Sequence, residues 1–178
     1  MANVFAVSDH HFGHANILKF TKNDEGELLR PGFADVEEMN EFMIEKHNSV
    51  VRPNDKVYFG GDIAMNPNFV KLVERMNGHK RLILGNHDHG KVKLYTPYFE
   101  AFYSSRLLDR MLFTHIPVHP SSIGKSIANV HGHTHGQHKF GPKYFDVSVE
   151  AINYTPISLE EIKKRVLKQL EEASVQST

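Results

Sequence analysis

Short apolar runs that end directly in aspartate, asparagine or histidine are the feature that most constrains this chain. The run NVFAVS, for example, leads straight into Asp9. The polar donors at or near the ends of such runs are Asp9, His11, Asp62, Asn86, His115, His133 and His135. Because the ends of neighbouring strands meet at one edge of a sheet, these donors predict a single site assembled from several loops.

The chemistry of these donors favours metal ions. The chain of 178 residues has 13 histidines and no cysteine. Neutral imidazole with carboxylate and amide oxygen suits a first-row divalent metal, whereas thiolate is the usual ligand of a closed structural zinc site. We therefore interpret the donors as the centre of a two-metal hydrolase. Mn²⁺ is the favoured ion, and iron, Zn²⁺, Co²⁺ and Ni²⁺ are alternatives.

Composition argues against several other classes. Basic and acidic residues both number 21, so the chain has no general attraction to a polyanion or to a membrane surface. Hydrophobic residues make up 40% of the chain, which is typical of a globular protein. No apolar stretch is long enough to span a bilayer, and the first residues lack the features of a signal peptide. We expect a cytoplasmic protein without an obligate protein partner.

Residue periodicity predicts alternating strands and helices, then a strand-rich half, then a closing helix. Asp35 with Glu38, and later Ser158, are predicted helix caps. Strands are predicted over 3–8, 56–59, 80–84, 100–108, 111–115, 128–131 and 144–149, with a hairpin at 109–110, and helices over 35–51, 68–76 and 158–173. This order predicts an α/β fold of two packed mixed sheets flanked by helices, in one domain over 1–178. The polar segment 21–34 is predicted to be a surface loop near the site.

Five motifs follow one another along the chain. They are Asp9-x-His11, Gly61-Asp62, Gly85-Asn86-His87-Asp88, His115 and Gly132-His133-x-His135. In this order they resemble the motifs of the calcineurin-like metallophosphoesterase superfamily, and the resemblance runs from about residue 3 to residue 150. The opening Asp-x-His-Phe-Gly-His-x-Asn-Ile further resembles a short branch found among bacterial and phage members. The resemblance implies a four-layer α/β/β/α sandwich.

The resemblance also implies two metal sites. The implied ligands are Asp62 as the bridge, Asp9, His11 and His135 for one ion, and Asn86, His115 and His133 for the other. A shared anionic ligand is needed because two dications about 3.5–4 Å apart repel each other strongly. Residues two apart in an extended segment point to the same side, so the pairs 9 with 11 and 133 with 135 can converge on one cluster.

Two dications against two aspartates leave a positive cluster. Metal coordination can lower the pKa of a bridging water to about 7, so that a hydroxide attacks phosphorus in line. By resemblance, His87 acts as general acid or electrostatic stabiliser at the leaving group. Asp88 is expected to orient His87 or to raise its pKa.

The favoured substrate is a phosphodiester, either a small nucleotide-type diester or a nucleic-acid end. A phosphomonoester dianion usually needs fixed cations beyond the metals, and near the motifs the sequence offers mostly imidazoles. Candidates for contact with the substrate are His14, Arg30 and His119, of which Arg30 could grip a phosphate. A phosphomonoesterase, including a protein or nucleotide phosphatase, is an alternative. A catalytically weak binding scaffold of the same fold is another.

The remaining histidines are predicted to lie outside the site. His131 is predicted to be a buried, hydrogen-bonded core residue. The others are predicted to be exposed or at helix ends, namely His10, His47, His79, His89 and His138.

Overall fold

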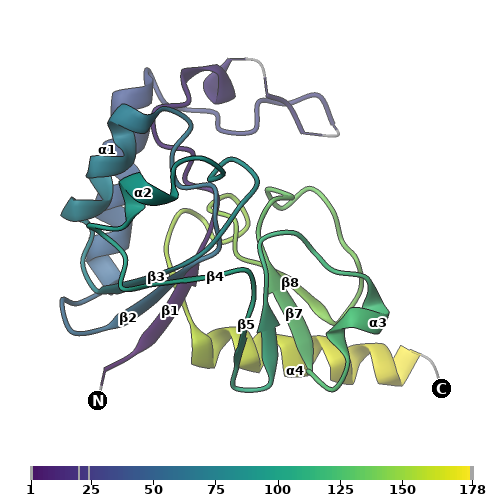
Figure 1. The fold of residues 1–178 in the computed structure, drawn as a ribbon. Helices are drawn as coiled ribbons and strands as arrows, with labels where there is room; N and C mark the ends of the chain where they lie inside the picture. Colours follow the sequence, from purple (N-terminus) through teal and green to yellow (C-terminus); the bar gives the residue numbers. More distant parts are fainter. Residues whose placement is uncertain (1, 20, 24, 177–178) are drawn as a thin grey trace.

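Two mixed β-sheets form the centre of the molecule (Figure 1). The computed structural model describes residues 2–19, 21–23 and 25–176. The first sheet has the order β4-β3-β2-β1-β9. Its strands are β1 (Val4–Val7), β2 (Lys56–Phe59), β3 (His79–Ile83), β4 (Ala101–Tyr103) and β9 (Ile157–Ser158). Strands β1 to β4 are parallel, and β9 pairs with β1 in the antiparallel sense.

The second sheet has the order β5-β6-β7-β8. Its strands are β5 (Arg106–Leu108), β6 (Met111–Phe113), β7 (Ala128–His131) and β8 (Tyr144–Asp146). The last three are parallel, and β5 is antiparallel to β6. A backbone bridge between Ser8 and Ser148 joins the two sheets just beyond β1 and β8.

Helices flank both sheets, which confirms the predicted fold class. They are α1 (Val36–Val50), α2 (Val92–Tyr95), α3 (Pro120–Ile123) and α4 (Leu159–Gln176), with 3-10 helices η1 (Ala15–Leu18) and η2 (Pro67–Arg75). Figure 1 shows α1 and α2 beside the first sheet, while α4 runs along the base of both. Helix α4 contacts β1, β9 and β8, so it ties the sheets together.

Alternation along the strands separates two apolar cores. In β1, Phe5 and Val7 belong to the core under α1, and Ala6 between them belongs to the core shared by the second sheet and α4. This follows from the strand period of two, which sends successive side chains to opposite faces. Met39 and Met43, one turn apart on α1, fill the first core. Burial on both faces explains why the strands appear in the sequence as short continuous apolar runs.

The single strand predicted over 100–108 is wrong, because the chain crosses between the sheets within it. Strand β4 ends at Tyr103 and pairs with β3, whereas β5 begins at Arg106 and pairs with β6. The predicted hairpin is formed by β5 and β6 alone. Its turn residues Asp109 and Arg110 both have positive φ, as tight two-residue hairpin turns favour.

The predicted helix caps are present. The Asp35 carboxylate accepts a hydrogen bond from Glu38 N at 2.8 Å, and Ser158 Oγ accepts one from Glu161 N at 3.1 Å. The helix predicted over 68–76 is the 3-10 helix η2. In the described part of the chain, no helix combines the length and apolar character needed to cross a membrane.

Candidate metal centre

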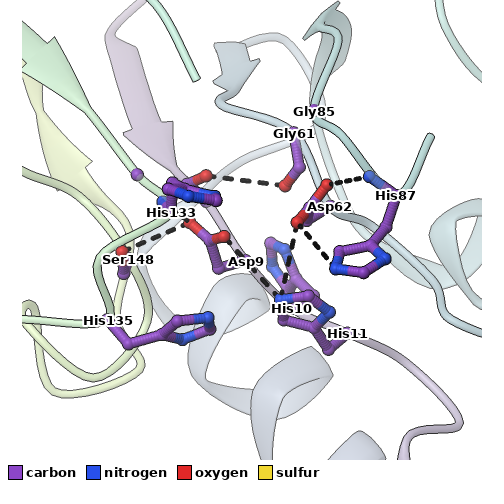
Figure 2. Close-up of polar contacts among 12 residues, drawn as sticks. Asp9, His10, His11, Gly61, Asp62, Gly85, His87, His133, His135 and Ser148 are labelled. Atoms are coloured by element: carbon purple, nitrogen blue, oxygen red, sulfur yellow. Dashed lines mark hydrogen bonds and ion pairs between the residues drawn. The ribbon is translucent and has the colours of Figure 1, made fainter. Parts of the chain in front are cut away.

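The predicted metal ligands meet at the carboxyl ends of parallel strands. The loops that follow β1, β2, β3, β6 and β7 carry, in that order, Asp9 with His11, Asp62, Asn86, His115, and His133 with His135. Loops at this end of a parallel sheet converge, which is why sites form there. Figure 2 shows side chains from several of these loops turned toward a common space: Asp9, His11, Asp62, His133 and His135.

Two groups of side chains place their potential ligand atoms within 4.8 Å of one another. The first group is Asp9, His11 and His135, and the second group is Asp62, His115 and His133. These groups match the ligand sets that the resemblance implies. Asn86 lies beside the second group, since its Oδ1 is 2.8 Å from His115 Nε2.

Asp62 faces both groups through one oxygen atom. Its Oδ2 lies 3.7 Å from His11 Nε2 and 3.4 Å from His115 Nε2. Its other oxygen, Oδ1, accepts a hydrogen bond from the backbone N–H of His87 at 2.8 Å. The carboxylate is therefore fixed by the backbone and oriented as a bridging ligand would be.

Five candidate ligands have a left-handed backbone conformation. Their φ angles are 62° at Asp9, 50° at His11, 53° at Asp62, 69° at His133 and 51° at His135. Such angles are uncommon for residues other than glycine and are concentrated where the surrounding structure enforces them, often at functional sites. Our expectation that extended backbone aligns the pairs 9 with 11 and 133 with 135 is therefore wrong, because tight turns bring these side chains together.

Two glycines make room for the aspartates. A Cβ atom at Gly85 would collide with the carboxylate of Asp62, and one at Gly132 would collide with that of Asp9. Neither glycine has a positive φ, so the requirement is space rather than backbone freedom. Any larger residue would displace a candidate metal ligand.

Buried polar atoms of the first group lack hydrogen-bond partners among the described residues. They are Asp9 Oδ1 and both ring nitrogens of His11. Burial raises the pKa of Asp9 to about 6, and burial also lowers the pKa of His11 well below its usual value. Unpaired buried polar atoms are costly. A cation held between a carboxylate and neutral imidazoles would satisfy them, so these residues fit a divalent metal.

The second group contains a histidine with a raised pKa. His115 Nδ1 lies 2.8 Å from Gly60 O, and its Nε2 faces Asp62 and Asn86. Burial lowers the pKa of His115, but the hydrogen bond to Asp62 and the charges of Asp9 and Asp62 outweigh it and raise the value to about 9. Because Nδ1 is engaged by a backbone carbonyl, Nε2 is the atom left for a metal.

Sequence reasoning missed Glu150. Its Oε1 lies 3.0 Å from His135 Nδ1 and 2.6 Å from Arg30 Nε. A carboxylate on Nδ1 leaves Nε2 of His135 for a metal and fixes the orientation of the ring. Glu150 belongs to none of the five motifs. The only sign of it in the sequence is its position as an acidic residue directly after the predicted strand over 144–149.

The substrate-contact role predicted for Arg30 is wrong. Its side chain is fully buried, and it donates hydrogen bonds to His10 O at 2.7 Å and to Asp9 O at 2.5 Å. It also pairs with Glu150 and touches Met39 Sδ at 3.5 Å. The guanidinium is thus committed to the protein interior. The chain around Arg30 passes over the carboxyl ends of the strands (Figure 1), and the buried side chain of Arg30 holds it there.

The pairing predicted between Asp88 and His87 is wrong as well. Both Asp88 oxygens are occupied by four donors from elsewhere, namely the backbone N–H groups of residues 62, 63 and 85 and the hydroxyl of Tyr95. Asp88 therefore holds the loops that carry Asp62 and Asn86. His87 keeps a position at the site: its side chain is 44% exposed, and its Nε2 lies 4.0 Å from Asp62 Oδ2.

Of the other two substrate-contact candidates, one lies beside the ligand groups and one does not. The His14 ring lies 5.8 Å from that of His11, and its Nδ1 is buried without a partner among the described residues. His14 therefore adjoins the first group. His119 instead caps α3, where its Nδ1 accepts a hydrogen bond from Ser121 N, and it belongs to neither group.

His10, predicted to be exposed or at a helix end, lies in the core instead. His47 lies in the last turn of α1, as predicted, and its side chain is buried. The ring centroids of His10 and His47 lie 5.4 and 5.7 Å from that of Phe59. Burial lowers the pKa of both, so they remain neutral. The prediction for His131 is confirmed, since it is buried with its Nδ1 2.9 Å from Gly132 O. The remaining three, His79, His89 and His138, are not buried.

Each ligand group adjoins a pocket. One of about 340 Å³ is lined by His135, Glu150 and Lys139 among others. Another of about 270 Å³ is lined by Asn86, His115 and neighbouring apolar residues. A larger cavity of about 750 Å³ lies between α4 and the segment 136–146, and none of the candidate ligands lines it.

The two-sheet sandwich and the paired carboxylate–imidazole groups at the ends of its strands are those of a metallophosphoesterase. The chain belongs to the calcineurin-like phosphoesterase family, whose model matches residues 2–173. The family implies a metal-dependent phosphoester hydrolase that uses divalent ions, and the two ligand groups fit that requirement.

The chain is also similar to individual proteins. Uncharacterized protein MJ1445 of Methanocaldococcus jannaschii is 35% identical over 179 residues, covering 94% of this chain and 93% of its own. The Gene 66 protein of Mycobacterium phage L5 is 32% identical over 93 residues, covering 49% of this chain and 41% of its own. The crystal structure of AQ665, a protein of unknown function from Aquifex aeolicus, shares the fold with a TM-score of 0.71 at 23% identity, covering 92% of this chain and 99% of its own.

Proposed function

We propose that the protein is a phosphodiesterase that uses two divalent ions, preferably Mn²⁺, to cleave small nucleotide-type diesters or nucleic-acid ends. The observation that carries the proposal is the pair of pockets, one against each ligand group. A phosphodiester has two organic substituents and a monoester has one. Separate pockets beside His135 and beside His115 offer a place for each substituent of a diester.

The residues divide the chemical work. Bound divalent ions supply an ionised water as nucleophile and neutralise charge on the phosphate. Asp62 sets the spacing of the two groups because one oxygen faces both. His87 stands beside them with an exposed ring, so it is placed to donate a proton to the leaving oxygen. Asp88 positions the loops of the second group and takes no part in proton transfer.

The interior position of Arg30 supports the diester assignment. A monoester dianion needs cations beyond the metals, and Arg30, which was our candidate for that role, is committed to Glu150 and to the backbone. One observation favours a monoesterase as the second candidate function. Lys139 is exposed and lines the pocket beside His135, where its ammonium group could approach a phosphate.

The deciding experiment compares kcat/KM for bis-p-nitrophenyl phosphate and p-nitrophenyl phosphate with Mn²⁺ at one pH, followed by 2′,3′-cyclic nucleotides. We expect the diester to be preferred. A clear preference for the monoester, lost selectively in Lys139→Ala, would establish the phosphomonoesterase instead. Fewer than one metal ion per chain after loading with Mn²⁺ and gel filtration would favour the binding scaffold.

A further inference from the structure

Beneath the first ligand group lies a buried ion pair that no catalytic motif contains. The Arg30 side chain has no exposed surface, and that of Glu150 is 9% exposed. Their Nε and Oε1 atoms are 2.6 Å apart. Removing two charges from water is costly unless hydrogen bonds satisfy the remaining donors and acceptors, so such a pair calls for an explanation from its contacts.

Arg30 donates hydrogen bonds to the backbone that carries two residues of the first group, Asp9 and His11. Its two terminal nitrogens donate to Asp9 O and His10 O, the carbonyl oxygens of the two peptide bonds that link Asp9 to His11. Both Asp9 and His11 have positive φ, a conformation that persists only when the surroundings impose it. The planar guanidinium fork fixes two acceptors at once, which a single ammonium group does not reproduce.

Glu150 contacts the side chain of His135, another member of the first group. The oxygen that accepts from Arg30 also bonds His135 Nδ1 at 3.0 Å, so one ion pair reaches a ligand on the loop after β7 and two ligands on the loop after β1. Charge balance matters too, because an unpaired guanidinium close to Asp9 would oppose a dication. Glu150 cancels that charge while orienting the imidazole.

We propose that Arg30 and Glu150 are positioning residues that shape the first metal site alone. The second group has its own supports: His115 Nδ1 faces Gly60 O, the Asp62 carboxylate accepts from the backbone N–H of His87, and the backbone N–H of Asp62 donates to Asp88. The ion pair thus connects the segment 21–34 with the first metal site, although Arg30 itself does not contact substrate. This inference rests on the metal centre in the proposed function and concerns affinity for the ion, not the ester cleaved.

The test measures Mn²⁺ affinity by equilibrium dialysis in two backgrounds. His115→Ala disables the second group and His135→Ala disables the first, so each background reports one site. Arg30→Lys keeps the charge but loses the fork. We expect it to weaken Mn²⁺ binding about 10- to 100-fold in the His115→Ala background, the usual effect of altering a partner of a metal ligand. In the His135→Ala background we expect no change.

Glu150→Gln provides a second variant in case Arg30→Lys folds poorly. It keeps the shape of the side chain and an acceptor for His135 while leaving the guanidinium charge unbalanced, so it too should weaken only the first site. Arg75→Met is the matched control, because Arg75 makes two 2.6 Å hydrogen bonds with Glu41 on the exposed surface. Urea unfolding of the metal-free variants reports whether each one folds.

Two results would overturn the inference. One is that a variant weakens Mn²⁺ binding equally at the two sites; the other is that neither Arg30→Lys nor Glu150→Gln weakens it at all. Selective weakening at the first site supports it, because a general loss of stability does not distinguish the sites. The proposed function fails separately: a chain that binds two Mn²⁺ ions and cleaves no phosphoester would refute the phosphodiesterase and leave this inference standing.

Discussion

The two ligand groups lie side by side but are built differently. In the first, Asp9 and His11 are buried, the His11 nitrogens have no partner among the described residues, and a buried ion pair supports the group from below. In the second, His133 and the adjoining Asn86 are exposed, and His115, whose Nε2 faces Asp62 and Asn86, has a raised pKa. We infer that the first group is built to hold an ion, whereas the second lies open to solvent and must lose the proton of His115 when it binds an ion.

This difference assigns a direction to the site. The exposed side of the centre carries His87, Asn86 and His133, so we expect substrate to approach from that side. The buried side carries the contacts that fix the geometry. The fold holds the ligands on the buried side in place before an ion binds. Such preorganisation of charged and polar groups is what makes electrostatic stabilisation effective in catalysis.

The largest expected effect comes from the one ligand that faces both groups. Asp62→Asn removes the negative charge that screens two dications from each other, so both ions should be lost together and activity with them. Elemental analysis after Mn²⁺ loading measures this directly. His135→Ala is the matched variant and should empty mainly the first site. Retention of one full metal equivalent in Asp62→Asn would show that the groups do not share a bridge.

His87 tests whether the exposed side performs the proton transfer. In His87→Ala, kcat for diesters with alkoxide-like leaving groups should fall about 10²- to 10⁴-fold, the usual contribution of general acid catalysis. Esters of p-nitrophenol should lose far less, because nitrophenolate leaves without a proton. Metal content should stay at the wild-type level. An equal loss on both types of ester would assign His87 to positioning instead.

The proton on His115 predicts that the second group binds metal with a steep pH dependence. Its pKa is raised to about 9 in the metal-free protein, so below that pH an ion must displace a proton. Affinity in the His135→Ala background should then fall roughly tenfold per pH unit, or about 100-fold from pH 8.5 to 6.5, and level off above pH 9.

The first group should show a shallower slope over the same range. Burial lowers the pKa of His11 well below its usual value. Burial lowers the pKa of His135, but Glu150 and Asp9 outweigh it and raise the value on balance, so of these two imidazoles only that of His135 has a proton to lose in this range. Dialysis against Mn²⁺ at several pH values in the His115→Ala background measures the slope. Identical slopes in the two backgrounds would remove the distinction drawn between the groups.

The sequence was sufficient to predict which candidate ligands lie together, because each follows a strand with a clearly apolar sequence. Asp62 and His115, for example, come shortly after runs that bury both faces, and the parallel topology brings those ends together. The two sheets and the helix caps at Asp35 and Ser158 were predictable for similar local reasons. The change of sheet after Tyr103 was not, because apolar residues continue on both sides of it.

The supporting contacts could not be predicted, because they join residues far apart in the chain. Arg30 and Glu150 are separated by 120 positions, and nothing local distinguishes a buried arginine from an exposed one. Asp88 illustrates a second limit. Its neighbour His87 suggested a pair, yet the carboxylate turns inward to backbone N–H groups of another loop. Positions within a motif are visible in a sequence, while the direction of each side chain is decided by tertiary packing.

The smallest expected effect concerns Ser148, which supports the first group from the second sheet. Its Oγ lies 3.2 Å from Asp9 Oδ2 and 2.6 Å from Asp146 Oδ1, so its single proton is shared between the two carboxylates and helps to hold Asp9 in place. Ser148→Ala removes a hydrogen bond with a net value of about 0.5–1.5 kcal/mol, which corresponds to about 2- to 13-fold in affinity. Mn²⁺ binding should weaken by that factor in the His115→Ala background and remain unchanged in the His135→Ala background. Ser49→Ala, on the exposed face of α1, is the control. An equal loss at the two sites would show that the junction between the sheets supports both groups alike, against the division of support proposed for Arg30 and Glu150.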